Sequence, residues 1–230
     1  MAGKMVKPPV NIPQERRRAW DKKAEGISGQ RAVRETLLFE TAARLFNSHG
    51  FHGTSMSQLT HELGLTKGAL YYYVEDKSDL LYKLHIKSVD ATRKAYNMGV
   101  AEGRNGFERV RGIIRHYVAA VTASPSETFI LLEKGALKPE QAEDIVRQRK
   151  QLELDLRGQI SKGIDDGSIV PCDAKLAAFV LVGAMAWVSK WFEPDKRWTP
   201  DQIAQAMAEM LIRSIAAMPS DALVEDVAQL

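Results

Sequence analysis

The chain is divided between residues 31 and 81 into short helical segments with clearly marked breaks. Apolar residues recur at helical spacing through residues 30–48, and Gly50 supplies the left-handed residue that ends a helix. Ser55 then begins a second segment, with Gln58 three residues later, a pair that predicts a capping box. These helix-start and helix-end signals predict short helices joined by tight turns.

A turn at Gly64 joins the second helix to a third, because only glycine reaches positive φ without steric cost. Thr66 is expected to cap the third helix, which should end near Tyr73. Leu70 and Val74 are four residues apart, so they share a face that should pack against the first helix. The exposed face would then carry Lys67, Gly68, Tyr71 and Tyr72. This arrangement is a helix-turn-helix, which places its last helix in the major groove of DNA.

The third helix suits a DNA groove in length and chemistry. Seven helical residues span roughly 10 Å, and the major groove is about 12 Å wide. Lys67 offers charge, small residues follow it, and free N–H groups at helix starts make Ser55 and Lys77 candidate phosphate clamps. A tyrosine-rich helix is more often an ordinary half-buried element, but the caps and the turn favour DNA binding. The candidate DNA contacts are Thr54, Ser55, Ser57, Thr66, Lys67, Gly68, Ala69, Tyr71, Tyr72, Tyr73 and Lys77.

Charge is unevenly distributed along the chain. Residues 1–94 contain 16 basic and 10 acidic residues (+6), whereas residues 95–230 contain 16 basic and 19 acidic residues (−3). An excess of positive charge in the part of the chain that is expected to bind DNA favours attraction to the phosphates. The basic segment 1–28 is either a solvated leader or an arm that adds minor-groove contacts. Cys172 is the one cysteine, and no apolar leader is visible, so we expect a cytoplasmic protein without a disulfide.

The rest of the chain is also predicted to be helical. N-cap signatures recur, and in no run do apolar and polar residues alternate with period two. Asn105 with Glu108, Thr199 with Gln202, and Asp173 mark three of the helix starts. The expected helices are 77–103, 106–122, 125–135, 139–166, 173–193 and 200–217. With the first three, they make an all-α protein of about nine helices.

The segment from Leu176 to Val188 is almost entirely apolar but is too short for a membrane span of roughly 20 residues. A helix that is hydrophobic all round must be covered on several sides. Paired with the last helix, it could form a four-helix dimer interface about a twofold axis. The candidate interface residues are Ala177, Val180, Gly183, Ala184, Ile203, Met207, Met210 and Leu211. Alternatively, these surfaces fill the core of a single subunit.

Residues 31–81 resemble the DNA-binding domain of the tetracycline-repressor (TetR) family of bacterial regulators. The resemblance is carried by Leu38, Ala42, Ala43, Leu45, Phe46, Gly50, Phe51, Thr54, Ser55, Leu59, the run Leu63-Gly64-Leu65, the run Lys67 to Val74, Lys77, Leu80 and Leu81. Val74 departs from the family, in which an aromatic residue is commoner at this position. The resemblance implies a homodimeric, ligand-responsive repressor of a palindromic operator. It also implies dimer contacts through the last two helices.

The resemblance further implies a small-molecule effector that acts on the helix 77–103 and so changes the spacing of the two reading helices. Candidate wall residues are Tyr96, Phe107, Ile114, Tyr117, Val121, Phe129, Leu132, Leu156, Trp187, Lys190 and Trp191. The stretch from Trp187 to Asp195 is similar to a subgroup that controls fatty-acid, steroid or aromatic-acid catabolism and often senses acyl-coenzyme A thioesters. Tryptophan can stack on adenine and Lys190 can hold a phosphate. Alternatively, both tryptophans anchor the helix end against the core.

No catalytic or metal-binding constellation is found in the sequence. His49 and His52 are three residues apart but lie at a helix end, and there is no cysteine pair, so zinc is not expected. We therefore expect no cofactor and no enzyme activity. A DNA-binding protein without a small effector, architectural or partner-controlled, stays open as an alternative. An enzyme acting on acyl compounds is less favoured.

The sequence thus predicts a basic arm at 1–28, a helix-turn-helix domain at 29–76 and a tail at 218–230. Between them, residues 77–217 are expected to form a helical domain for effector binding and dimerisation. The expected partners are double-stranded DNA, a small effector such as an acyl-CoA and a second copy of the chain, with no membrane.

Overall fold

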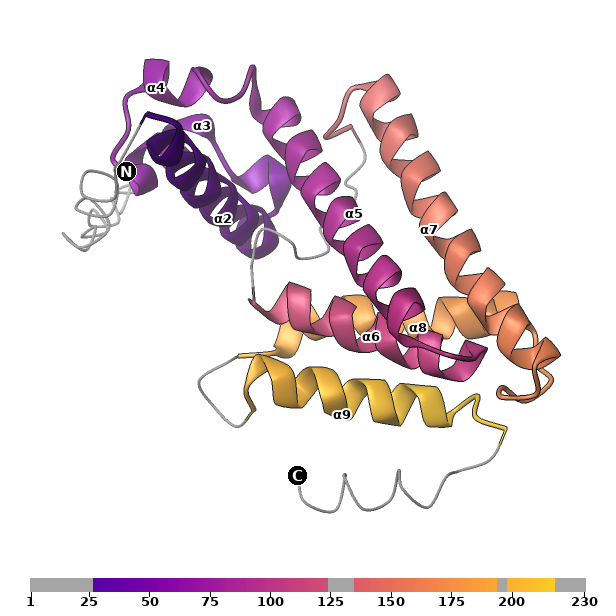
Figure 1. The fold of residues 1–230 in the computed structure, drawn as a ribbon. Coiled ribbons are helices and arrows are strands. Elements are labelled where there is room, and N and C mark those ends of the chain that lie inside the picture. The colour runs from indigo at the N-terminus through magenta and orange to yellow at the C-terminus, as the bar shows by residue number, and fades with distance from the viewer. Residues whose placement is uncertain (1–26, 124–134, 194–197, 218–230) are drawn as a thin grey trace, which may run out of the picture. The chain divides into compact units, whose positions relative to one another are not determined.

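The computed structural model describes residues 27–123, 135–193 and 198–217. These residues form eight α-helices, and their one β-type pairing is an isolated bridge between Ile169 and Ala216. The chain divides into two compact units, Met1–Lys77 and Ser78–Leu230 (Figure 1). The all-α prediction is confirmed. The predicted tail, residues 1–26 of the predicted basic arm and residues 125–134 of the predicted helix 125–135 lie outside the described residues, whereas residues 27 and 28 of the arm begin a helix.

The first unit contains α2 (Ile27–Gly53), α3 (Met56–Leu63) and α4 (Lys67–Tyr71). Gly50 interrupts α2 with φ 73° and ψ 167°, at the place where the sequence predicts a helix end, and a last helical turn follows it. The core of this unit consists of Leu38, Phe39, Ala42, Ala43, Leu45, Phe46, Phe51, Leu59, Leu63, Leu70 and Val74. The apolar stripe of α2 is therefore covered by the two shorter helices.

The predicted caps of the two short helices are present. The hydroxyl of Ser55 accepts a hydrogen bond from the Gln58 N–H at 3.1 Å, and Thr66 accepts one from the Ala69 N–H at 3.3 Å. Gly64 has φ 66° and ψ 29°, the left-handed conformation expected for this turn. Helix α4 ends at Tyr71, two residues earlier than predicted.

The second unit is built from α5 (Lys77–Glu102), α6 (Gly106–Ala123), α7 (Pro139–Asp165), α8 (Ala174–Trp191) and α9 (Pro200–Arg213). Helix α6 packs against α7, α8 and α9, and α7 also packs against α8 (Figure 1). The core includes Val110, Ile114, Val118, Ile160, Ala178, Leu181, Val188, Ala204, Ala208 and Ile212. All of these elements agree with the predicted ranges to within four residues.

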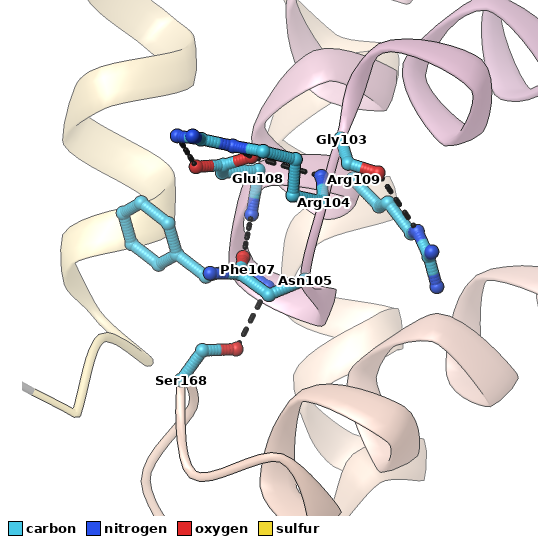
Figure 2. A network of polar contacts seen from close by, with 7 residues as sticks. All are labelled: Gly103, Arg104, Asn105, Phe107, Glu108, Arg109 and Ser168. Atoms are coloured by element: carbon cyan, nitrogen blue, oxygen red, sulfur yellow. Dashed lines mark hydrogen bonds and ion pairs between the residues drawn. The ribbon is translucent and has the colours of Figure 1, made fainter.

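The turn between α5 and α6 is fixed by a polar network around Asn105 (Figure 2). The Asn105 side chain accepts a hydrogen bond from the Glu108 N–H at 2.9 Å. The Glu108 carboxylate in turn accepts the Arg104 N–H at 2.9 Å and pairs with its guanidinium at 2.8 Å. Ser168, from the turn after α7, accepts a hydrogen bond from the Phe107 N–H at 3.1 Å. The predicted cap at Asn105 is therefore present and is tied to a second segment of the unit.

The other two predicted helix starts are also capped. Thr199 and Gln202 form a reciprocal capping box, with distances of 2.9 and 3.2 Å. Asp173 accepts hydrogen bonds from the Lys175 and Leu176 N–H groups at the start of α8. These side chains satisfy backbone donors that have no partner within the helix.

Helices α5 and α6 approach each other closely at a pair of glycines, Gly99 and Gly112. A Cβ atom added to Gly99 would lie 2.2 Å from the backbone nitrogen of Ile113, and one added to Gly112 would lie 2.9 Å from the Cα of Gly99. Only residues without a side chain allow this contact between the two backbones.

Candidate nucleic-acid interface and ligand cavity

Helix α4 has one buried and one exposed face, as the spacing predicts. Leu70 is fully buried and Val74 is 2% exposed, whereas Tyr71 and Tyr72 are 48% and 68% exposed. Lys67 and Gly68 are exposed as well. A Cβ atom added to Gly68 would meet no atom within 4 Å. The outer face therefore offers a cation, a thin backbone segment and two aromatic rings.

Several polar residues surround this face. Ser55, Ser57 and Thr66 are exposed at the starts of α3 and α4. Ala69 and Tyr73 are half-buried. Arg31 of α2 places its guanidinium 5.5 Å from the centre of the Tyr72 ring, a cation–π contact. Arg31 is not among the predicted DNA contacts, because periodicity does not show which residue of α2 lies beside the tyrosines.

Thr54 and Lys77 have a different environment. Thr54 is buried, and its hydroxyl donates to the Gly50 carbonyl at 3.0 Å. The Lys77 ammonium donates to the carbonyls of Phe51 and Thr54, both at 2.8 Å, and lies 4.1 Å from the centre of the Phe51 ring. These contacts stabilise the turn between α2 and α3, so we leave both residues out of the proposed DNA contacts.

The second unit contains a cavity of about 150 Å³ lined by α5, α6, α7 and α8. Its walls are Ser88, Val89, Thr92, Tyr96, Ile113, Tyr117, Arg149, Leu152, Glu153, Leu156, Val182, Met185 and Ala186. Three of the predicted wall residues, Tyr96, Tyr117 and Leu156, line this cavity. The remaining members were missed, among them two charged residues of α7.

The other predicted wall residues lie elsewhere. Ile114 and Val121 are buried in the core, and Phe107 packs against it. Trp187, Lys190 and Trp191 are exposed on α8 and do not line the cavity. Phe129 and Leu132 lie outside the described residues. A helical apolar pattern identifies an inward face but does not distinguish a packed wall from a hollow one.

A buried polar pair adjoins the cavity. Arg149 donates from Nη2 to Nδ1 of His85 at 2.9 Å, because a guanidinium has donors only. His85 is fully buried, and burial, helped by the Arg149 charge, lowers the pKa of His85 to about 3. The imidazole is therefore neutral near pH 7 and serves as an acceptor for Arg149.

Helix α8 exposes an apolar stripe on the side away from the core. Leu176, Phe179, Val180, Trp187 and Trp191 are exposed large apolar residues of this stripe, and exposed Gly183 lies among them. Met210 is exposed on α9, and Ala184, Met207 and Leu211 are half-buried. Ala177 and Ile203 instead belong to the core of their own chain, so we do not include them in the proposed interface.

Helix α8 has a mean hydropathy of 1.3 over 18 residues. By length and composition alone, it could cross a membrane. Its buried residues Ala178, Leu181 and Val188 join the core, as those of a globular domain do. Within the described part of the chain, no group of three or more His, Cys, Asp or Glu residues could hold a metal ion.

Two family models match the chain. Residues 38–84 match the model of bacterial regulatory proteins of the tetR family, and residues 103–215 match a tetracyclin repressor-like C-terminal domain. The first match covers the helix-turn-helix, and the second covers the helices that line the cavity apart from α5.

Individual relatives agree with these matches. The transcriptional repressor KstR2 of Rhodococcus jostii is 24% identical over 200 residues, which cover 84% of this chain and 96% of that protein. AibR, whose crystal structure was determined with isovaleryl coenzyme A and operator DNA, is 33% identical in sequence. Its structure matches this chain with a TM-score of 0.67 over 78% of this chain and 98% of AibR. KstR2 of Mycobacterium tuberculosis, at 21% identity and a TM-score of 0.71, shares the fold. The chain belongs to the TetR family of bacterial helix-turn-helix regulators.

Proposed function

We propose that this protein is a homodimeric, cytoplasmic repressor that binds a palindromic operator through α3 and α4 and leaves it when an acyl-CoA thioester binds the second unit. The observation that carries the DNA-binding role is the outer face of α4. There Lys67, Gly68, Tyr71 and Tyr72 are exposed while Leu70 is fully buried behind them.

The exposed face of α4 can make two kinds of contact with DNA, to the bases and to the phosphates. The Lys67 ammonium can pair with a phosphate or donate a hydrogen bond to an acceptor on a guanine edge. The tyrosines can reach phosphates or thymine methyl groups. Gly68 lets the backbone of α4 approach the bases. Ser55, Ser57 and Thr66 at the helix starts add phosphate contacts that fix the position of the protein on the duplex.

The second copy of the chain pairs through the exposed apolar stripe of α8, together with Met210 of α9. Large apolar residues at helical spacing on a surface are typical of an interaction site. A dimer that binds two half-sites of an operator must present its two copies of α4 about 34 Å apart, one turn of DNA.

The acyl-CoA effector is supported by AibR, whose crystal structure contains isovaleryl coenzyme A and operator DNA. In this chain, α5 starts at Lys77, the last residue of the first unit, and its residues Ser88, Val89, Thr92 and Tyr96 line the cavity. A ligand that moves α5 would therefore change the DNA-binding unit through a continuous helix. Such coupling between two sites is allosteric.

The DNA-binding role is tested by fluorescence anisotropy with labelled DNA from upstream of the gene. We expect Lys67→Ala and Tyr71→Ala each to weaken binding by about tenfold, a loss of roughly 1.4 kcal/mol. Lys175→Ala, which changes an exposed lysine of α8, should bind as the wild type does. Unchanged binding by both α4 variants would contradict the assignment of the reading helix.

The effector role is tested by adding isovaleryl-CoA to the preformed complex. A fall in anisotropy with the CoA ester, but not with free coenzyme A, is the expected result. If a panel of acyl-CoA esters of different chain lengths gives neither release nor heat of binding in calorimetry, the acyl-CoA proposal is wrong.

A further inference from the structure

The cavity between α5, α6, α7 and α8 is small, and its wall is not uniformly apolar. An apolar cavity of about 150 Å³ holds a molecule of roughly six non-hydrogen atoms, such as benzene. Three helices nevertheless each bring a polar side chain to this wall: Ser88 from α5, Tyr117 from α6 and Glu153 from α7. A ligand made only of hydrocarbon would give these side chains no polar partner.

Tyr117 brings a hydroxyl to the cavity wall. The residue is only 7% exposed, yet its hydroxyl makes no hydrogen bond with the described part of the chain. Burial raises the pKa of Tyr117 to about 12, which keeps the hydroxyl protonated near neutral pH. A buried hydroxyl without a partner costs free energy that a polar group of a ligand would recover.

Ser88 brings a second hydroxyl to the wall. The residue is 4% exposed, and its side-chain oxygen has no hydrogen-bond partner among the residues that the structure describes. A serine or threonine in a helix can return its hydroxyl to the carbonyl four residues earlier, as Thr92 does to the Ser88 carbonyl at 2.8 Å, but Ser88 makes no such bond. Its hydroxyl can therefore serve a ligand as donor or as acceptor.

Glu153 gives the wall an acceptor. The residue is 9% exposed, and its Oε2 accepts a hydrogen bond from the Lys150 ammonium at 2.6 Å. The Arg157 Nε lies 3.6 Å from Oε1, an ion pair too long to be a hydrogen bond, and Oε1 makes none within the described segments. Because an ionised carboxylate can only accept, this oxygen can be satisfied only by a donor.

The other polar residues of the wall already have partners. The Thr92 hydroxyl donates a hydrogen bond and the Tyr96 hydroxyl accepts one, each at 2.8 Å. Arg149 is engaged as well, with His85 at 2.9 Å among its partners, so we assign no ligand contact to it. The wall groups assigned to a ligand are therefore two hydroxyls and one carboxylate.

We propose that the cavity selects a short acyl group that carries a hydroxyl at the end distal to the thioester. The inference rests on the proposed function, because it assumes that an acyl-CoA is the effector. A hydroxyl both donates and accepts, so it can donate to Glu153 and accept from Tyr117 or Ser88. A ketone has no donor for Glu153, and a carboxylate would lose its hydration beside another group that only accepts.

The test compares four CoA esters of nearly equal shape in calorimetric titrations of the full-length protein. Isovaleryl-CoA ends in two methyl groups, 3-hydroxybutanoyl-CoA replaces one of them by a hydroxyl, acetoacetyl-CoA replaces it by a keto oxygen, and malonyl-CoA ends in a carboxylate. Each acyl group has six non-hydrogen atoms, which suits the volume of the cavity. We expect one enantiomer of 3-hydroxybutanoyl-CoA to bind about ten- to a hundredfold more tightly than each of the other three esters.

Two variants assign the preference to the wall hydroxyls. Ser88→Ala and Tyr117→Phe each remove one hydroxyl and keep the rest of the side chain. Each should reduce the preference severalfold, while operator binding without ligand and the melting temperature stay as in the wild type, because neither hydroxyl has a bond to lose. Ser214→Ala, which removes an exposed hydroxyl at the end of α9, is the matched control and should leave the preference intact.

A third variant tests the acceptor. Glu153→Gln keeps the shape of the side chain but adds N–H donors to the wall. The advantage of 3-hydroxybutanoyl-CoA over acetoacetyl-CoA should therefore shrink, because the keto oxygen then meets a donor.

The outcomes separate the two proposals. If the esters bind but isovaleryl-CoA, acetoacetyl-CoA or malonyl-CoA binds as tightly as the hydroxy ester, the selectivity proposal is overturned and the acyl-CoA proposal stands. A preference that persists unchanged in Ser88→Ala, Tyr117→Phe and Glu153→Gln also overturns it. If none of the four esters binds, the acyl-CoA proposal fails, and the selectivity proposal fails with it.

Discussion

Gly68 lies on the exposed face of α4, where the absence of a side chain has a cost for the free protein. Glycine in a helix is about 0.5–1 kcal/mol less favourable than alanine, and the space around Gly68 is open. No packing contact within the described residues therefore explains glycine at this position. The proposed close approach of the α4 backbone to DNA would explain it.

Gly68→Ala should accordingly separate folding from binding. We expect the melting temperature to stay the same or rise slightly, because the added methyl group meets no atom and favours the helix. Operator affinity should fall severalfold, because the methyl group holds the backbone away from the base edges. Circular dichroism and fluorescence anisotropy on the same preparation measure both, and full affinity in the variant would show that this face does not approach the bases.

Gly99 is a second glycine whose role is purely structural. Gly99→Ala should lower the free energy of unfolding by about 3 kcal/mol, because the new Cβ atom would lie 2.2 Å from a backbone nitrogen of α6. Gly158→Ala on α7 is the matched control, since a Cβ atom there meets nothing within 4 Å, and it should stabilise the protein by up to about 1 kcal/mol. Equal urea midpoints for the two variants would contradict the close contact of α5 and α6.

Helix boundaries were predictable because local side chains specify them. Ser55, Thr66, Asp173 and Thr199 each cap a helix that begins at the next residue, and this signal needs no knowledge of the tertiary fold. The end of α4 was predicted too late, because nothing local to Tyr71 marks a stop.

The cavity was less predictable, because it depends on how four helices rotate against one another. Ile114 and Tyr117 are both apolar, inward-facing residues of α6, yet only Tyr117 reaches the cavity. Arg149 lies on a helix rich in charged residues, where sequence alone favours solvent exposure. Its position three and seven residues before Leu152 and Leu156 is the signal that could have found it.

The start of α6 gives a prediction for the dependence of stability on pH. Hydrogen bonds from Arg104, first from its side chain and then from its backbone N–H, lower the pKa of Glu108 to about 2. A carboxylate with a lowered folded-state pKa stabilises the protein above its ordinary pKa of about 4.5, and this stabilisation is lost as the pH falls towards 2.

Glu108→Gln should therefore lower the free energy of unfolding near pH 7 by about 1 kcal/mol, a modest value because the Arg104 side chain is 88% exposed and water screens the pair. The difference between variant and wild type should shrink between pH 4.5 and 2. Urea unfolding at several pH values measures it, and a difference independent of pH would contradict the role of the Glu108 charge.

The whole molecule is proposed to act as a dimer that pairs through α8. Val180 on α8 and Val146 on α7 are exposed to nearly the same extent, 54% and 56%. Val180→Arg should produce a monomer with greatly weakened operator binding, because the charge would be buried against the partner. Val146→Arg should leave the dimer intact. Light scattering gives the mass of each, and a Val180→Arg dimer that still binds DNA would exclude this interface.

Two copies of α4 are proposed to enter one duplex together, and hydroxyl-radical footprinting on DNA from upstream of the gene can show whether they do. We predict two protected half-sites of related inverted sequence, centred about one helical turn or a small multiple of it apart. Lys67→Ala and Tyr71→Ala should weaken both halves equally. A single protected segment without inverted symmetry, or protection that both variants leave unchanged, would contradict the account.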